Sequence, residues 1–328
     1  MNRLIRPVSI GTLALKNNLV MAPMAGYTQR GLRMLARQQG AAMAVTEMIS
    51  AYEILRPSRK TRRMIRIAQD DHPLGVQVFG ADPLMMADAA ARIEQMGCFD
   101  LIDVNMACPV RKMIAKGNGG AMLRTPDLGL EILAGMRRAT RLPLTVKVRR
   151  GYDASTAGRE QVERLLAGAD ELGVDAATIH GRTVDQLYHG QADWSFAVEM
   201  AGRLRMPVFG SGDLLDAPSI LDRLRGGGIV GVAVARGAVG HPWIFREAMA
   251  LDAGLPVEPV SPAERVECMW QHYDMLRDEL GDYSAIRIMR RFGMFYSKGI
   301  DRARESRMAM GKVASRDDLA EVIKEYLE

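Results

Sequence analysis

Eight short, mostly apolar runs recur along the first three quarters of the chain. They cover residues 19–22, 42–46, 75–79, 101–105, 144–148, 176–180, 208–210 and 230–235. Each run shows little alternation between apolar and polar positions, which is typical of parallel strands buried on both faces. Ahead of them, the segment 8–15, with Gly11 at its middle, predicts a small hairpin.

Helical patterns with recognisable start and stop signals separate these runs. They span 83–96, 126–142, 157–172, 193–204 and 216–225. Asp82 and Thr125, each followed by Pro, are typical of a first turn, and Gly97 and Gly173 are typical of a helix end. Eight strands alternating with helices predict an α/β protein, a (β/α)8 TIM barrel. A doubly wound open sheet is the weaker alternative, because no GxGxxG follows the first strand.

The pattern changes after Phe245. The segment 254–259 has the composition of a linker, and 262–280, 285–298 and 316–327 show helical periodicity without any strand signal. The chain is therefore predicted to form a barrel domain over residues 1–248 and a small C-terminal all-helical domain over 249–328.

Composition narrows the class of protein. The chain has 328 residues, 48% of them hydrophobic, which is ordinary for a globular protein with a full core. Three cysteines are too few for a disulfide framework, and no Cys or His spacing suggests a metal site. No apolar segment approaches the length of a membrane span, so we expect a soluble, cytoplasmic protein that does not bind a membrane.

The net charge of +5 is mild, but the cations are concentrated in two clusters. The first holds six cations and no acid: Arg56, Arg59, Lys60, Arg62, Arg63 and Arg66. The second surrounds Phe292, Phe295 and Tyr296 and holds nine cations: Arg287, Arg290, Arg291, Lys298, Arg302, Arg304, Arg307, Lys312 and Arg316. Two such clusters indicate a polyanionic partner, although a solvated charged face is an alternative for each.

The carboxyl ends of barrel strands are where active sites form, and polar groups gather there. Cys108 follows one run and precedes Pro109, beside cationic and glycine-rich sequence; a lone Cys is also commonly a small buried residue. Lys147 and Arg149 alternate on another strand, so both point the same way, and a ligand anion is favoured over a structural ion pair. Glycine-flanked loops after the last two strands suit a phosphate. Together these residues indicate a phosphorylated, anionic cofactor opposite a reactive thiol.

Five segments resemble the tRNA-dihydrouridine synthases, and the bacterial B-type subgroup looks closest. They are APMAGYT at 22–28, VQVFG at 76–80, DVNMACP at 103–109, KVR at 147–149 and HGRT at 180–183. The resemblance implies an FMN-bound barrel and a helical domain that helps to hold tRNA. It also implies reduction of the C5=C6 bond of specific uridines to 5,6-dihydrouridine, with NADPH reducing FMN and hydride passing to C6.

Carried over motif by motif, the resemblance assigns roles to residues. Cys108 would protonate C5. The residues that would contact FMN are Pro23, Met24, Ala25, Gln77, Lys147, His180, Ser211, Gly212, Asp213, Ala235 and Arg236. The residues that would contact the substrate are Asn105, Arg149, Arg182, Arg287, Arg290, Arg291 and Lys298. Ser211 and Ala235 depart from the family pattern, which usually has Asn and Gly there.

Two other functions remain open at this stage. An FMN-dependent reductase of a small molecule, such as a free pyrimidine or an enone, would share the barrel and the cofactor but would not need a basic helical domain. A flavin-free tRNA-binding chaperone would use the basic clusters to bind tRNA and would not need the cofactor site. A Schiff-base aldolase using Lys147 is disfavoured, because Cys108 and Arg149 would then lack a common purpose.

Overall fold

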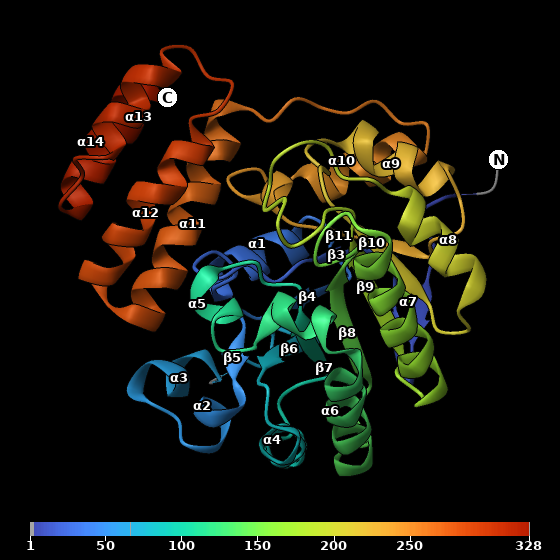
Figure 1. Cartoon of the computed structure of the whole chain (residues 1–328). Helices are drawn as coiled ribbons and strands as arrows, with labels where there is room; N and C mark the ends of the chain where they lie inside the picture. The colour runs from blue at the N-terminus through green and yellow to red at the C-terminus, as the bar shows by residue number, and fades with distance from the viewer. Residues whose placement is uncertain (1–2, 66, 328) are drawn as a thin grey trace.

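A closed barrel of eight parallel strands forms the centre of the molecule in a computed structural model, which describes residues 3–65 and 67–327 (Figure 1). The strands are β3 (Leu19–Met21), β4 (Met43–Val45), β6 (Leu74–Phe79), β7 (Leu101–Met106), β8 (Leu144–Arg149), β9 (Ala176–His180), β10 (Val208–Ser211) and β11 (Gly231–Val234). Pairing of β4 with β6 and of β11 with β3 closes the ring, and the two-residue strand β5 (Ile49–Ser50) pairs in parallel with the carboxyl end of β6. The predicted TIM barrel is confirmed strand by strand. Arg66 of the first basic cluster lies outside the described residues.

Helices cover the outside of the barrel (Figure 1). They are α1 (Arg30–Gln38), α4 (Pro83–Met96), α6 (Pro126–Ala139), α7 (Thr156–Glu171), α8 (Ser195–Arg203), α9 (Ala217–Arg225) and α10 (Ile244–Asp252). The five predicted helices are all present, and α1 and α10 are additional. At α4 the predicted signals act as expected, since the Asp82 carboxylate accepts the N–H of Met85 and Gly97 ends the helix with φ +63°. No helix in the described parts of the chain is long and apolar enough to cross a membrane.

Shorter elements lie in the loops and at the amino end of the barrel. The loops carry α2 (Ala51–Leu55), α3 (Arg59–Met64), α5 (Arg111–Ile114) and the 3₁₀ turns η1 (Gly119–Arg124) and η2 (Arg236–Ala238). The predicted hairpin is confirmed as β1 (Val8–Ile10) paired with β2 (Leu13–Leu15). Its Ile10 and Leu15 pack against Leu101 and Phe209 of the barrel interior and so seal the amino end.

Four helices build the C-terminal domain: α11 (Pro262–Leu280), α12 (Asp282–Tyr296), α13 (Ala303–Met310) and α14 (Arg316–Tyr326). Three of them were predicted, and α13 was not. The predicted domain boundary after residue 248 falls inside α10. That helix packs on α9, and the carboxylate of Asp252 accepts the N–H groups of Leu4 and Ile5. We therefore propose that the connection 253–261 separates the domains.

The helical domain packs closely on the barrel, mainly through α11 against α1. A Cβ added at Gly31 would lie 2.6 Å from the ring of buried His272, so glycine is required for this approach. Arg291 donates to the carbonyl of Gly26, and its guanidinium lies 4.2 Å from the centre of the Tyr27 ring. This docking brings α12 to the rim of the barrel.

Candidate active site at the carboxyl end of the barrel

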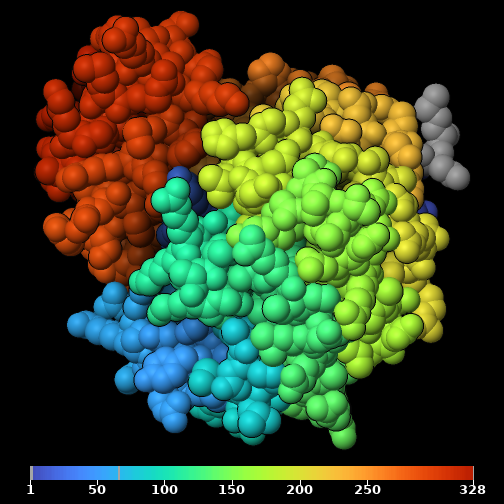
Figure 2. All heavy atoms as spheres, in the orientation of Figure 1, coloured from blue at the N-terminus to red at the C-terminus, as the bar shows by residue number. Residues whose placement is uncertain are grey.

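A cavity of about 450 Å³ opens at the carboxyl end of the barrel strands. All the residues predicted to contact the cofactor line its wall, and so do Asn105, Cys108 and Arg149. In Figure 2 a hollow lies between the helical domain (red) and the barrel, with part of the N-terminal barrel segment (dark blue) visible inside it. The strand ends thus bring together side chains from positions 23 to 236 of the sequence.

The remaining predicted residues lie away from the cavity wall. Arg182 is buried behind it, where it pairs with Asp213 at 2.7 Å. Four more belong to α12 or follow it: Arg287, Arg290, Arg291 and Lys298. Arg290 donates to the carbonyl of Val313 and Arg291 to that of Gly26, whereas Arg287 and Lys298 are exposed.

The wall also contains residues that sequence reasoning missed. They are Ala22, Tyr27, Met48, Ala107, Pro109, Val110, Tyr188, Leu214, Leu215, Val239 and Phe295. Several of them, Tyr27 among them, lie within the segments that carried the family resemblance and were available as a signal. Tyr188 had none, because it reaches the cavity only through the path of a loop. Phe295 was noted within the second basic cluster, but its place on the cavity wall depends on the docking of α12.

Asn105 holds the loop that carries Cys108. Its Oδ1 accepts the N–H groups of Ala107 at 3.2 Å and Cys108 at 3.0 Å, while its Nδ2 donates to Gln77 at 2.7 Å. Gln77 in turn donates to the buried carboxylate of Asp103 at 2.6 Å. Burial raises the pKa of the Cys108 thiol, so it is protonated at neutral pH and is suited to act as an acid.

Arg149 joins the loops that follow β7 and β9, the two strands that pair with its own strand β8. Its side chain is almost fully buried and donates to the carbonyls of Ala107 (2.9 Å), Thr183 (2.7 Å) and Leu187 (2.7 Å). Because three donors of its guanidinium are used on the backbone, Arg149 orders the wall around Cys108 as well as contributing charge.

Lys147 presents an ammonium group to the cavity. No hydrogen bond or ion pair satisfies it among residues 3–65 and 67–327. Burial, and then the nearby Arg149, lower its pKa to about 8, and the neighbouring Asp103 only partly offsets this. An ammonium group that is shielded from water on a cavity wall and has no partner favours an anionic ligand.

His180 is a neutral donor. Its Nδ1 lies 3.2 Å from the N–H of Arg182 and accepts that hydrogen bond, so Nε2 carries the proton. Burial, followed by the surrounding Lys147, Arg149, Arg182 and Arg236, lowers the pKa of His180 to about 2. The ring therefore stays uncharged across the physiological range.

The loops after β10 and β11 form a second anion-binding feature. Gly212 has φ +120°, and a Cβ there would lie 2.7 Å from Ala192. Asp213 holds both loops, since it pairs with Arg182 and, at 3.1 Å, with Arg236. Within the described chain the N–H groups of Gly212, Asp213 and Arg236 meet no acceptor, which suits a phosphate. The hydroxyl of Ser211 is turned to the carbonyl of Ala233 at 2.9 Å.

Binding of an anionic, phosphate-bearing ligand is expected to weaken as pH rises through about 8. Lys147 is protonated below its pKa of about 8 and loses its charge above it, so the attraction is strongest well below pH 8 and declines as the pH rises above it. Titration of the ligand-free protein with FMN, used as a phosphate-bearing probe and followed by flavin fluorescence on either side of pH 8, measures the effect. The variant Lys147→Arg, which stays charged, should flatten the profile; a flat profile in the wild type would contradict the assignment.

These features define a (β/α)8 barrel with a cationic cavity, whose loops suit a phosphate group, beside a neutral thiol. In the described residues, no three His, Cys, Asp or Glu side chains are grouped to hold a metal ion. The sequence model of the dihydrouridine synthase family matches residues 20–328. The chain therefore belongs to this family.

Individual relatives support the assignment. The chain is 33% identical over 322 residues to tRNA-dihydrouridine synthase B of Pseudomonas aeruginosa, covering 97% of this chain and 95% of the relative. It is 34% identical over 305 residues to a probable tRNA-dihydrouridine synthase of Treponema pallidum, covering 90% and 89%. Among solved structures, morphinone reductase in complex with tetrahydroNAD superposes with a TM-score of 0.56 at 14% identity, over 81% of this chain and 94% of that one. This last likeness supports the barrel fold.

Proposed function

We propose that this protein reduces the C5=C6 bond of specific uridines in tRNA to 5,6-dihydrouridine, with FMN as cofactor and NADPH as reductant. The observation that carries the proposal is the lining of one cavity. It contains the unpaired ammonium of Lys147, loops whose N–H groups suit a phosphate, and the neutral thiol of Cys108. Family membership, and relatives that are described as tRNA-dihydrouridine synthases, support tRNA as the substrate.

The residues present fit FMN. The N–H groups of Gly212 and Arg236, with the Arg236 guanidinium, would hold the phosphate, and Lys147 would stabilise negative charge on the ring system. When bound, FMN would supply the hydride for C6 of uracil after its own reduction by NADPH. The side chains of this protein then have to manage the proton and the charge that develops on the base.

Cys108 would supply the proton. Hydride at C6 leaves an electron pair at C5 that is delocalised onto the C4 oxygen, and transfer of the Sγ proton to C5 completes the new C–H bond. The resulting thiolate would lie near Arg149 and Lys147, which stabilise it until solvent returns a proton. His180 would offer its Nε2–H to a carbonyl oxygen of the base. The sum is uridine, NADPH and one proton giving dihydrouridine and NADP⁺.

Asn105 is better described as a positioning residue. Its Oδ1 accepts two backbone N–H groups and its Nδ2 donates to Gln77, with Met48 Sδ 3.7 Å away. We propose that it orients the Cys108 loop in place of a direct contact with uracil.

The test is an assay of the purified protein with NADPH and tRNA from cells that lack dihydrouridine. We expect visible flavin absorption from the protein and dihydrouridine in the digested tRNA by mass spectrometry. Turnover of free uridine or an enone, without product in tRNA, would instead identify a small-molecule reductase. A colourless protein that binds tRNA even after FMN is added would identify the chaperone function.

The exposed cations of the helical domain are expected to contact the tRNA backbone. The double variant Arg287→Ala/Lys298→Ala should weaken tRNA binding and lower the slope of log K against log salt by roughly 1.5, because each phosphate contact releases a counterion. Filter binding from 50 to 300 mM salt measures it.

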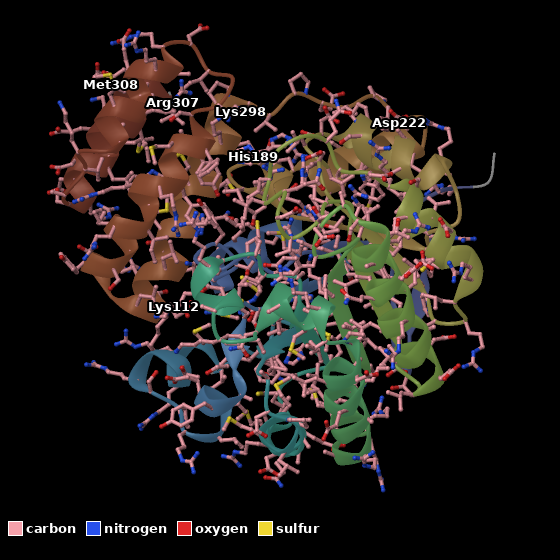
Figure 3. All side chains as sticks on the ribbon, viewed as in Figure 1. Lys112, His189, Asp222, Lys298, Arg307 and Met308 are labelled. Carbon is pink, nitrogen blue, oxygen red and sulfur yellow. The ribbon has the colours of Figure 1, made fainter. Side chains whose placement is uncertain are left out.

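The matched control for that measurement is Arg225→Ala. Arg225 pairs with Asp222, which lies at the upper right of the barrel in Figure 3, away from the helical domain. The slope of log K against log salt for Arg225→Ala should equal that of the wild type. An unchanged slope in the double variant would remove Arg287 and Lys298 from the interface.

A further inference from the structure

We propose that Tyr27 and Phe295 form an aromatic ledge on which the base next to the target uridine stacks. The inference rests on the proposed function and names a further substrate contact. It assigns to the helical domain a direct role at the active site, through one side chain of α12.

The burial of the aromatic residues in α12 singles out Phe295. Phe292 and Tyr296 are four residues apart on one helix face, and both are fully buried. Phe295 points in another direction, keeps 38% of its surface exposed and lines the cavity. A large apolar ring left open at the mouth of a polar cavity is typical of a binding site.

The ledge is held rigidly by both domains. The rings of Tyr27 and Phe295 meet edge to face at 6.0 Å, and Tyr27 also meets Phe292 at 5.7 Å. Gly240, with φ +68°, lies so close that a Cβ there would come within 2.5 Å of the Phe295 Cβ. With Arg291 over the Tyr27 ring, both side chains are ordered before any ligand arrives, which lowers the entropic cost of binding.

The order of the strands places the ledge across the cavity from the thiol. Cys108 follows β7, whereas Val239 and Gly240, beside Phe295, follow β11. The path β7-β6-β4-β3-β11 takes four steps around the eight-stranded ring, so the two loops are opposite each other. A uracil placed against Cys108 therefore leaves Phe295 to a neighbouring nucleotide.

The surroundings suit a single-stranded segment of RNA. Lys298 follows Phe295 by three residues, and Figure 3 shows Lys112 and Lys298 reaching the boundary between the barrel and the helical domain from two different segments. Cations that follow a phosphate backbone, together with aromatic rings that stack on bases, are how proteins hold extruded nucleotides.

The test compares Phe295→Leu with Phe295→Trp in the flavin-bound protein. The Leu variant keeps apolar contact with Tyr27 but loses the stacking face. It should raise KM for tRNA roughly tenfold, equal to about 1.4 kcal/mol, and change kcat less than about twofold. The Trp variant should restore KM. Melting temperature and flavin content, measured for both variants, separate a loss of stacking from a loss of folding or of cofactor binding.

The control is Met294→Ala, since Met294 is equally exposed on α12 but does not line the cavity. A wild-type KM in Phe295→Leu, or failure of Trp to restore it, would overturn the ledge. The dissociation constant for tRNA, measured directly, separates the two proposals. If the wild type makes no dihydrouridine but Phe295→Leu still binds tRNA tenfold more weakly, the reductase proposal fails and the ledge stands.

Discussion

Replacing Cys108 with Ala is expected to slow dihydrouridine formation by at least about a hundredfold while the protein keeps its flavin. The thiol is the group on the cavity wall whose burial raises its pKa, so it holds a proton that it can give to C5. A general acid typically contributes two to four orders of magnitude in rate. The measurement is a single-turnover assay with reduced flavin and tRNA.

The hydrogen bonds that hold the Cys108 loop make the result for Cys108→Ala interpretable. The loop is held through the backbone N–H of Cys108, which Asn105 accepts, and through the carbonyl of Ala107, which Arg149 donates to. Neither bond uses the thiol, so Ala leaves the loop in place. Cys98→Ala is the matched control, because Cys98 is also partly buried but lies on the barrel's outer side, near the carbonyl of Ile65. Full activity of Cys108→Ala would exclude the thiol as the acid.

The barrel strands were predictable because each is a short, mostly apolar run that ends at glycine, proline or a polar cluster. The same reasoning failed for α13, whose sequence, ARESRMAM, buries only Ser306 and Met310 and leaves Met308 exposed. With only two buried positions in eight residues, α13 is too short for its apolar positions to establish a helical period. Its existence depends on packing against α12 and α14, which sequence periodicity does not contain.

The residues of the candidate site likewise fall into those that the sequence could predict and those that it could not. Strand-end residues such as Lys147 and His180 were found because a parallel barrel directs its strand ends to one face. Charge alone does not distinguish the α12 arginines that face solvent from those that contact other parts of the protein. Arg287 and Arg291 differ only in position along the helix, yet one is exposed and the other donates to a carbonyl of the barrel. That distinction depends on how α12 docks, as does the exposure of Phe295.

Replacing Arg149 with Met is expected to lower both stability and activity. Met has a similar length but leaves the carbonyls of Ala107, Thr183 and Leu187 without their donor. Hydrogen bonds to a charged group contribute roughly 1.5–3 kcal/mol each, and buried unsatisfied acceptors are costly. We expect a loss of about 3 kcal/mol or more in the free energy of unfolding and a fall in Tm of roughly 5 °C or more, measured by denaturant and thermal unfolding.

The activity of this variant should fall further than its stability requires, because Ala107 immediately precedes Cys108 and its carbonyl fixes the loop. Arg149→Lys should not rescue it, since one ammonium cannot reach three carbonyls in the fork geometry of a guanidinium. Arg159→Met is the control: its ion pair with Glu199 is exposed and that with Glu163 is half-buried, so its loss should cost about 1 kcal/mol or less. If Arg149→Met unfolded like Arg159→Met and kept its rate, Arg149 would act through its charge on the ligand alone, and the order of the Cys108 loop would have to come from Asn105.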